Sequence, residues 1–214
     1  LSQPGFIRAQ VNKANNYLLI DWARDSIWRF FPPVQLEGVG WVLHPVDLAV
    51  NKVLALAGRD EPRDFIDTLY LHESVLPLGA LVWAAVGKDP GLNPQMLLEL
   101  LQRKGRISMD ELRRLDLKKM PEPATLREQW KSALDSARKW ISQRPGDEAG
   151  CLYTHPETGL VFAPKADEPA EVLRGKTGGV LPRVRDVPIR SFYESKAIRE
   201  SLEAFFQLPL RDGG

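Results

Sequence analysis

Two helices joined by one sharp break form the sequence feature that most constrains this fold. Proline is tolerated in the first turn of a helix, so His44-Pro45 predicts a helix start. The apolar residues that then recur at helical spacing are Val46, Ala49, Val50, Val53, Leu54 and Ala57. Gly58 predicts the end of this helix, and Asp60 with Pro62 predicts the cap and first turn of a second. The segment therefore predicts a bent two-helix corner.

The charged side chains expected near the bend are Lys52, Arg59, Arg63, Asp64 and Asp67. Lys52 lies beside the apolar stripe, so its stem can be buried while its ammonium reaches solvent. Arg63 and Asp67 are four residues apart, and Asp64 and Asp67 three apart, so each can contact its neighbour. Charges this dense on packed helices are costly unless they pair or face a charged ligand. The pattern therefore predicts either a polyphosphate site or a structural ion-pair network.

The order of these residues is Lys-x6-Arg-x3-Arg-Asp-x2-Asp, preceded by Asp47-Leu48-Ala49. This order resembles the third motif of the AbiE-type (AbiEii) abortive-infection toxins, a family of nucleotidyltransferases, and the resemblance covers residues 16–73. It implies that Lys52 contacts nucleotide phosphates and that four further residues shape the site. These four are Arg59, Arg63, Asp64 and Asp67.

The resemblance also implies an activity and partners. We expect Mg²⁺-dependent transfer of a nucleotide from a nucleoside triphosphate to an RNA, such as tRNA, or to a protein acceptor. A toxin of this kind is expected to have a cognate antitoxin.

A strand pattern at residues 17–23, rich in apolar and aromatic residues, contains a candidate metal ligand. Nucleotidyl transfer needs several carboxylates around Mg²⁺, because the metal bridges the phosphates and neutralises developing charge. The resemblance implies that Asp21 supplies one of them or activates the acceptor hydroxyl, with Asp25 as the second choice. The alternative is that Asp21 is an exposed strand residue at a sheet edge.

The proteins that the chain resembles carry two further metal-binding carboxylates as Asp-x-Asp, shortly after a Gly-Ser turn. No Asp here is followed two residues later by Asp or Glu, and no Gly-Ser pair precedes such a motif. One explanation is that the motif is encoded upstream of Leu1. The other is a relative that has lost catalysis and acts as a non-catalytic nucleic-acid- or protein-binding protein. The 214 residues alone are not expected to transfer nucleotides.

Composition excludes several classes of protein. The chain is 43% hydrophobic and 27% charged, as in an ordinary globular protein. It contains no run of about eighteen apolar residues, so no membrane span is expected, and its start does not predict a signal peptide. The single cysteine, Cys151, excludes an intramolecular disulfide and favours a reducing, cytoplasmic compartment.

The residues after Glu73 predict a helical bundle. Leu76 to Val86 is a nearly continuous apolar run, which indicates a buried helix. Asn93-Pro94 predicts a helix start by its cap and first-turn proline. Ser108-x-x-Glu111 and Thr125-x-x-Glu128 both match the capping box, so each predicts a further helix start.

The C-terminal third has a different composition. Residues 151–163 predict two strands joined by a turn with Gly159. Residues 174–199 hold seven Lys or Arg against two acidic residues, so they are either a phosphate-binding segment or a solvated surface. A closing helix is predicted at residues 198–206.

The prediction is therefore an α+β fold in three regions. Residues 1–75 form part of a nucleotidyltransferase-like core, with a mixed sheet and helices. Residues 76–145 form a helical bundle, and residues 146–214 form a small β-containing region with the basic segment and the closing helix.

Overall fold

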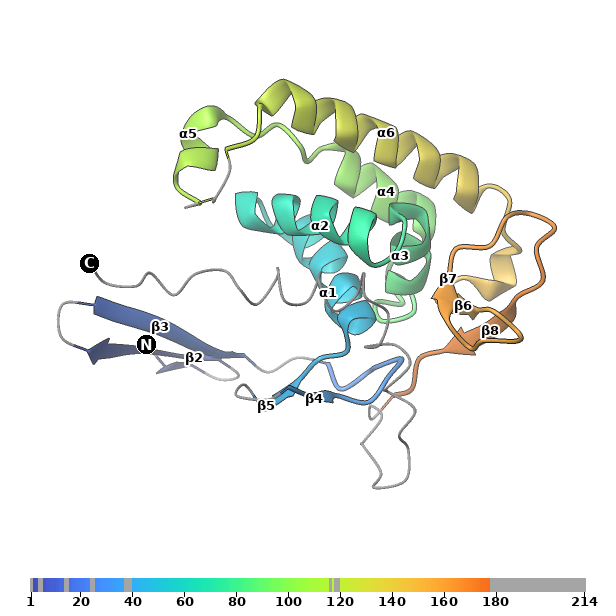
Figure 1. Cartoon of the computed structure of the whole chain (residues 1–214), viewed down its shortest axis with the longest axis horizontal. Helices are drawn as coiled ribbons and strands as arrows, with labels where there is room; N and C mark the ends of the chain where they lie inside the picture. Colours follow the sequence, from blue (N-terminus) through green and yellow to red (C-terminus); the bar gives the residue numbers. More distant parts are fainter. Residues whose placement is uncertain are drawn as a thin grey trace.

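The computed structural model describes residues 2–3, 6–13, 16–23, 26–36, 40–115, 117 and 120–177. Over these residues the fold is α+β, as predicted, with six α-helices. The sheets in the described residues are small and antiparallel, so the mixed sheet expected for residues 1–75 is wrong for this part of the chain. The helices form one body, from which a long hairpin extends on one side (Figure 1). A small sheet lies at the opposite end of the body.

The hairpin is built from β2 (Phe6–Lys13) and β3 (Asn16–Ala23), with the short β1 (Ser2–Gln3) along the other edge of β2. Its antiparallel register places Arg8 opposite Asp21. The strand expected at residues 17–23 is therefore confirmed as β3, with β2 as its partner. A second antiparallel pair, β4 (Val34–Leu36) with β5 (Gly40–Val42), leads into the first helix and was not predicted.

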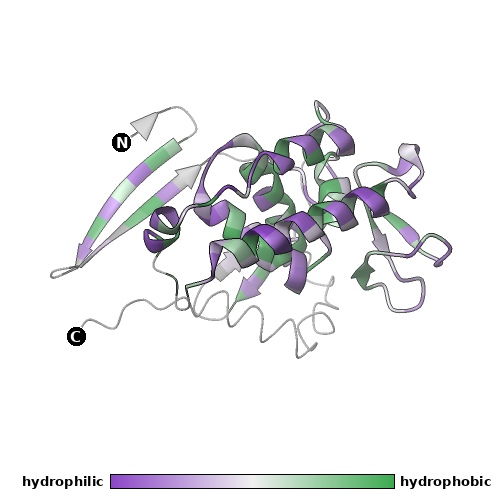
Figure 2. Ribbon diagram, turned by 90° about the horizontal axis from the view of Figure 1, so that it is seen from above, coloured by the Kyte–Doolittle hydropathy of each residue, from purple (hydrophilic) through white to green (hydrophobic). Residues whose placement is uncertain are grey.

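The helices are α1 (Pro45–Gly58), α2 (Pro62–Ser74), α3 (Leu78–Ala85), α4 (Pro94–Gln102), α5 (Met109–Arg113) and α6 (Pro123–Ile141). Helix α3 is buried at every position, which confirms the predicted core helix. The apolar core runs without interruption from Val46 of α1 to Tyr153 in the C-terminal sheet. Figure 2 shows hydrophilic and hydrophobic residues alternating along the helices, as expected where one face of a helix is buried.

Of the three helix starts predicted in the helical bundle, two are confirmed and one is wrong. The Asn93 side chain accepts a hydrogen bond from the backbone of Met96 at 2.9 Å, and Ser108 with Glu111 forms a complete capping box. Helix α6 begins at Pro123 instead of after a Thr125 cap. Proline lacks the N–H that would be unsatisfied in a first turn, so it starts this helix earlier and places Thr125 inside it.

The C-terminal sheet contains β6 (Cys151–Thr154), β7 (Val161–Phe162) and β8 (Glu171–Arg174), in the order β7-β6-β8. The first two are the predicted strands, whereas β8 was not expected. The predicted closing helix and the basic segment beyond Thr177 lie outside the described residues. No helix among the described residues is long and apolar enough to cross a membrane.

Candidate functional site

The corner between α1 and α2 is formed by local signals at three points. The Nδ1 of His44 accepts a hydrogen bond from the backbone N–H of Val46 at 3.3 Å and so caps the start of α1. Helix α1 ends at Gly58, as predicted, and Arg59 continues in extended backbone. Helix α2 starts at Pro62. The chain therefore bends within a few residues, and the two helices pack against each other.

The corner brings four of the five predicted side chains into one ion-pair network. Lys52 Nζ donates to Asp64 Oδ1 at 3.1 Å and lies 2.6 Å from Asp67 Oδ2. Arg59 Nε donates to Asp64 Oδ2 at 2.6 Å. Asp64 is the centre of the network, with its side chain only 1% exposed, whereas the Lys52 side chain is 21% exposed. Helices α1 and α2 are thus joined through a buried carboxylate.

Both central ions of this network stay charged despite their burial. Burial opposes the charge on Lys52, but the hydrogen bonds to Asp67 and Asp64 outweigh it and raise its pKa. Burial likewise opposes the charge on Asp64, and hydrogen bonds from Arg59 and Lys52 outweigh it and lower the pKa of that carboxyl. The Asp64 bond also raises the pKa of Arg59. The corner therefore holds a fixed set of ions.

The predicted neighbours of Asp67 on its own helix are not its partners. Its carboxylate reaches across to Lys52 on α1, whereas Arg63 is exposed and has no ion-pair partner among the residues that the structure describes. A contact between helices that also buries apolar surface is favoured over a solvent-exposed pair along one helix, which is worth little. The first turn of α2 therefore presents the guanidinium of Arg63 to solvent.

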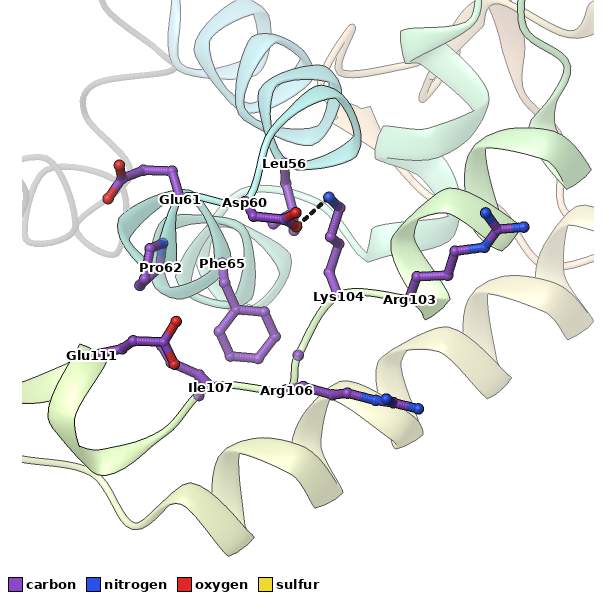
Figure 3. A pocket seen from close by; sticks show the side chains of 11 residues that line it. Leu56, Asp60, Glu61, Pro62, Phe65, Arg103, Lys104, Arg106, Ile107 and Glu111 are labelled. Atoms are coloured by element: carbon purple, nitrogen blue, oxygen red, sulfur yellow. Dashed lines mark hydrogen bonds and ion pairs between the residues drawn. The ribbon is translucent and has the colours of Figure 1, made fainter.

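The sequence predicted Asp60 as the N-cap of α2, and this prediction is wrong. The N-cap residue is Glu61, and its side chain makes no capping hydrogen bond. Asp60 instead pairs with Lys104, which follows α4. Both residues line a pocket of about 260 Å³, with Leu56 and Phe65 among its apolar walls (Figure 3).

Asp21, the predicted metal ligand, lies on the hairpin and forms a separate ion pair. Arg8 Nε donates to its Oδ1 at 2.6 Å, and Arg8 Nη2 donates to its Oδ2 at 2.7 Å. The hydrogen bonds from Arg8 lower the pKa of Asp21, although both side chains are largely exposed. The contacts of Asp21 are thus with β2, and those of Lys52 are with α2. The second choice, Asp25, lies outside the described residues.

The described residues do not by themselves form a magnesium site. Within the part of the chain that the structure describes, no group of three or more His, Cys, Asp or Glu side chains could hold a metal ion. Both carboxylate oxygens of Asp21 are already taken by Arg8. A Mg²⁺ ion prefers several carboxylate or phosphate oxygens in an octahedral arrangement. One exposed carboxylate in a bidentate ion pair does not meet that requirement.

Asp47 has a structural role that the sequence did not reveal. It is buried in the first turn of α1, where its Oδ1 and Oδ2 accept hydrogen bonds from the backbone of Phe30 at 2.9 Å and of Phe31 at 3.0 Å. Burial raises its pKa, and these two bonds oppose the shift. An acidic residue in a first helical turn indicates a capping interaction. This sequence signal does not indicate that the hydrogen-bond partners of Asp47 lie in the connection between β3 and β4.

Comparison with known proteins finds no family model, no curated protein and no solved structure that matches the chain. A functional conclusion therefore rests on the geometry of the charged corner and on the motif from which it is built.

Proposed function

We propose that this chain is part of an AbiE-type nucleotidyltransferase, which transfers a nucleotide from a nucleoside triphosphate to an RNA or protein acceptor. As the toxin of a cytoplasmic toxin–antitoxin pair, it would be opposed by a cognate antitoxin. The observation that supports the proposal most is the ion-pair network at the α1–α2 corner. The motif residues Lys52, Asp64 and Asp67 are in direct contact there, with the lysine shared by two carboxylates.

Lys52 is the proposed phosphate-binding residue. An ammonium has three N–H donors, and Asp64 and Asp67 occupy two of them. The third can donate to a phosphate oxygen, and the partial exposure of the side chain gives a ligand access to it. Because the two carboxylates hold the ammonium in place, little side-chain entropy is lost when a phosphate binds.

Arg63 is the second cation proposed to contact the triphosphate. It is exposed, and it projects from the first turn of α2, where the helix dipole also favours negative charge. Arg59 and Asp64 shape the site by holding Lys52 in register with α2. Asp21 is proposed as one carboxylate of a magnesium site or as the group that activates the acceptor hydroxyl. The further magnesium ligands would have to come from outside the described residues.

The test uses protein expressed from the whole reading frame, labelled nucleoside triphosphates and total RNA. Transfer of label is expected for the wild type and for Lys165→Ala, which removes an exposed lysine that follows β7 and is not part of the corner. Lys52→Ala is expected to reduce transfer on the order of a hundredfold, because the variant cannot make the charge-assisted hydrogen bond to the phosphate. Unchanged transfer by Lys52→Ala would contradict the role given to this lysine.

Arg63→Ala provides an independent variant whose fold is not at risk. Its side chain has no ion-pair partner among the described residues, so thermal unfolding is expected to match the wild type. The KM for the nucleoside triphosphate is expected to rise while kcat changes little, since Arg63 contributes to binding. A wild-type KM would remove Arg63 from the site.

The second candidate function is that of a non-catalytic relative that binds nucleic acid or protein. The observation that favours it is the bidentate Arg8–Asp21 pair, because the guanidinium competes with a metal for this carboxylate. This candidate predicts that the protein from the whole reading frame transfers no label with any nucleoside triphosphate. The residues encoded upstream of Leu1 separate the two candidates further, since a Gly-Ser turn followed by Asp-x-Asp is required only for the enzyme.

A further inference from the structure

A second charged feature of the molecule is a groove between α6 and the segment that joins α4 to α5. Its volume is about 340 Å³. One wall is a flank of α6 that includes the buried Trp130 and Leu134, and the other is formed by Gln102, Lys104, Gly105 and Arg106. None of the residues proposed to bind the triphosphate lines it, so the groove is a separate surface.

The charge of this groove is strongly positive, although the whole chain carries a formal net charge of only +1. The basic residues that line it are Lys104, Arg106, Arg127, Lys131 and Arg138, and the acidic one is Asp135. Lys104 is paired with Asp60 and Arg138 with Asp135. The remaining three cations are exposed and have no ion-pair partner among the described residues. This arrangement leaves unbalanced positive charge on one face.

The groove is held in shape by a close backbone approach. Gly105 adopts a positive φ of 86°, and a Cβ at this position would lie 2.5 Å from Cδ1 of Trp130 on α6. The absence of a side chain at Gly105 lets the segment lie directly on the indole ring. Arg106 is thereby fixed beside α6, and its side chain extends away from Phe65 (Figure 3).

The spacing of the cations along α6 suits an extended polyanion better than a single small ion. Arg127 and Lys131 are four residues apart and share a helix face, which corresponds to roughly 6 Å along the axis. Further along this face Arg138 pairs with Asp135, so among the described residues the unpaired cations of the row are Arg127 and Lys131. A nucleic-acid strand carries one negative charge per nucleotide, so its charges recur along the backbone. Arg127 and Lys131, with Arg106 on the other wall, can therefore contact neighbouring phosphates of one strand.

We propose that this groove binds the phosphate backbone of a nucleic-acid strand without reading its sequence. Arginine donates two parallel hydrogen bonds to a phosphate, and Arg106 and Arg127 face the same groove. The aromatic side chain among its described lining residues, Trp130, is buried and offers no surface on which bases can stack. Backbone recognition alone gives affinity with strong salt dependence.

The test is a binding titration of the full chain with a short fluorescein-labelled single-stranded RNA, without nucleoside triphosphate, over a range of salt concentrations. The double variant Arg127→Ala with Lys131→Ala is expected to weaken binding on the order of tenfold at low salt. The slope of log affinity against log salt is expected to become shallower by about 0.7 for each phosphate that the variant no longer neutralises. Both side chains are exposed, so thermal unfolding is expected to stay unchanged.

The matched control is Lys165→Ala with Lys176→Ala, which also removes two exposed positive charges but lies outside the groove. It is expected to bind RNA with the wild-type slope. Equal weakening by both double variants would show a diffuse charge effect and overturn the proposal. Failure of the wild-type protein to bind RNA at low salt would also overturn the proposal. So would competition by polyglutamate as effective as that by RNA at equal charge, because it would indicate an acidic protein partner. Because this titration measures no nucleotide transfer, failure of the catalytic proposal leaves its result intact.

Discussion

The guanidinium of Arg8 holds the carboxylate of Asp21 through two hydrogen bonds across the β2–β3 hairpin, at 2.6 and 2.7 Å. The two residues are direct partners in the strand register. A bidentate pair of this kind is stronger and more directional than a pair joined by one hydrogen bond. Any metal or acceptor that uses Asp21 therefore competes with Arg8, so this pair limits how readily the carboxylate is available.

Arg8→Ala is predicted to release Asp21. The pKa of its carboxyl is expected to rise from its lowered value towards the ordinary range, because the hydrogen bonds from Arg8 are the main cause of the shift. Carboxyl NMR across an acid titration measures this change. Gln10→Ala, an exposed change on the same strand, is the control and is expected to leave the pKa of Asp21 lowered. A titration unaffected by removal of Arg8 would show that the pair does not persist in solution.

Asp64 and Asp67 both contact Lys52, but they are predicted to differ in their effect on stability. Asp64→Asn leaves Arg59 and Lys52 without their buried partner and is expected to cost about 3 kcal/mol. Asp67→Asn removes a more exposed partner, with 22% of its side chain accessible, and is expected to cost less than about 1 kcal/mol. Denaturant unfolding measures both changes in stability. Equal costs would mean that the network is not centred on Asp64.

The corner itself was predictable from the sequence, because its signals are local. A proline after His44, a glycine at the end of α1 and a proline at the start of α2 each act within one helical turn. The partners within the corner were predictable only in part. Spacing along one helix favoured a contact between Arg63 and Asp67, whereas Asp67 meets Lys52 across two packed helices. Such contacts depend on the angle and depth of helix packing, which spacing does not encode.

The predictions failed for the same reason elsewhere in the molecule. Asp60 has the residue type of a helix cap, yet it pairs with Lys104, forty-four residues further along the chain. The buried Asp47 bonds to the backbone of Phe30 and Phe31, which precede the β4–β5 pair in the chain. The groove on α6 was missed because its cations come from α6 and from a loop that is adjacent only in the folded chain.

Gly105→Ala is predicted to destabilise the fold more than Gly159→Ala, although both glycines have positive φ. At Gly159, with φ 66° and no atom within 4 Å of a new Cβ, the cost is the conformational strain of about 1 kcal/mol. At Gly105 the Cβ also meets Trp130 at 2.5 Å, which adds about 1–3 kcal/mol. Denaturant unfolding compares the two. Equal destabilisation would mean that the indole ring moves aside without cost.

His44 is predicted to make the protein sensitive to mild acid. Its ring is buried and stacked on Phe31, with ring centroids 4.2 Å apart, and burial lowers its pKa from 6.5 to about 4. Between these pH values the unfolded chain binds a proton that the folded protein does not, so stability falls as the pH falls. The contribution of His44 to this decrease between pH 6.5 and pH 4 is expected to be about 3 kcal/mol.

His44→Asn isolates this effect from the other acids. Asparagine keeps a side-chain acceptor for the backbone N–H of Val46 but does not titrate. The pKa of Asp64 is lowered from 3.8, so this carboxyl changes the stability of the fold at pH values below this window. The pKa of Asp47 is raised, so protonation of this carboxyl increases stability as the pH falls. This effect is expected to be equal in the wild type and in His44→Asn. Between pH 6.5 and pH 4, the unfolding free energy of the wild type is therefore expected to fall by about 3 kcal/mol more than that of the variant. Parallel declines would show that His44 is not kept neutral by burial.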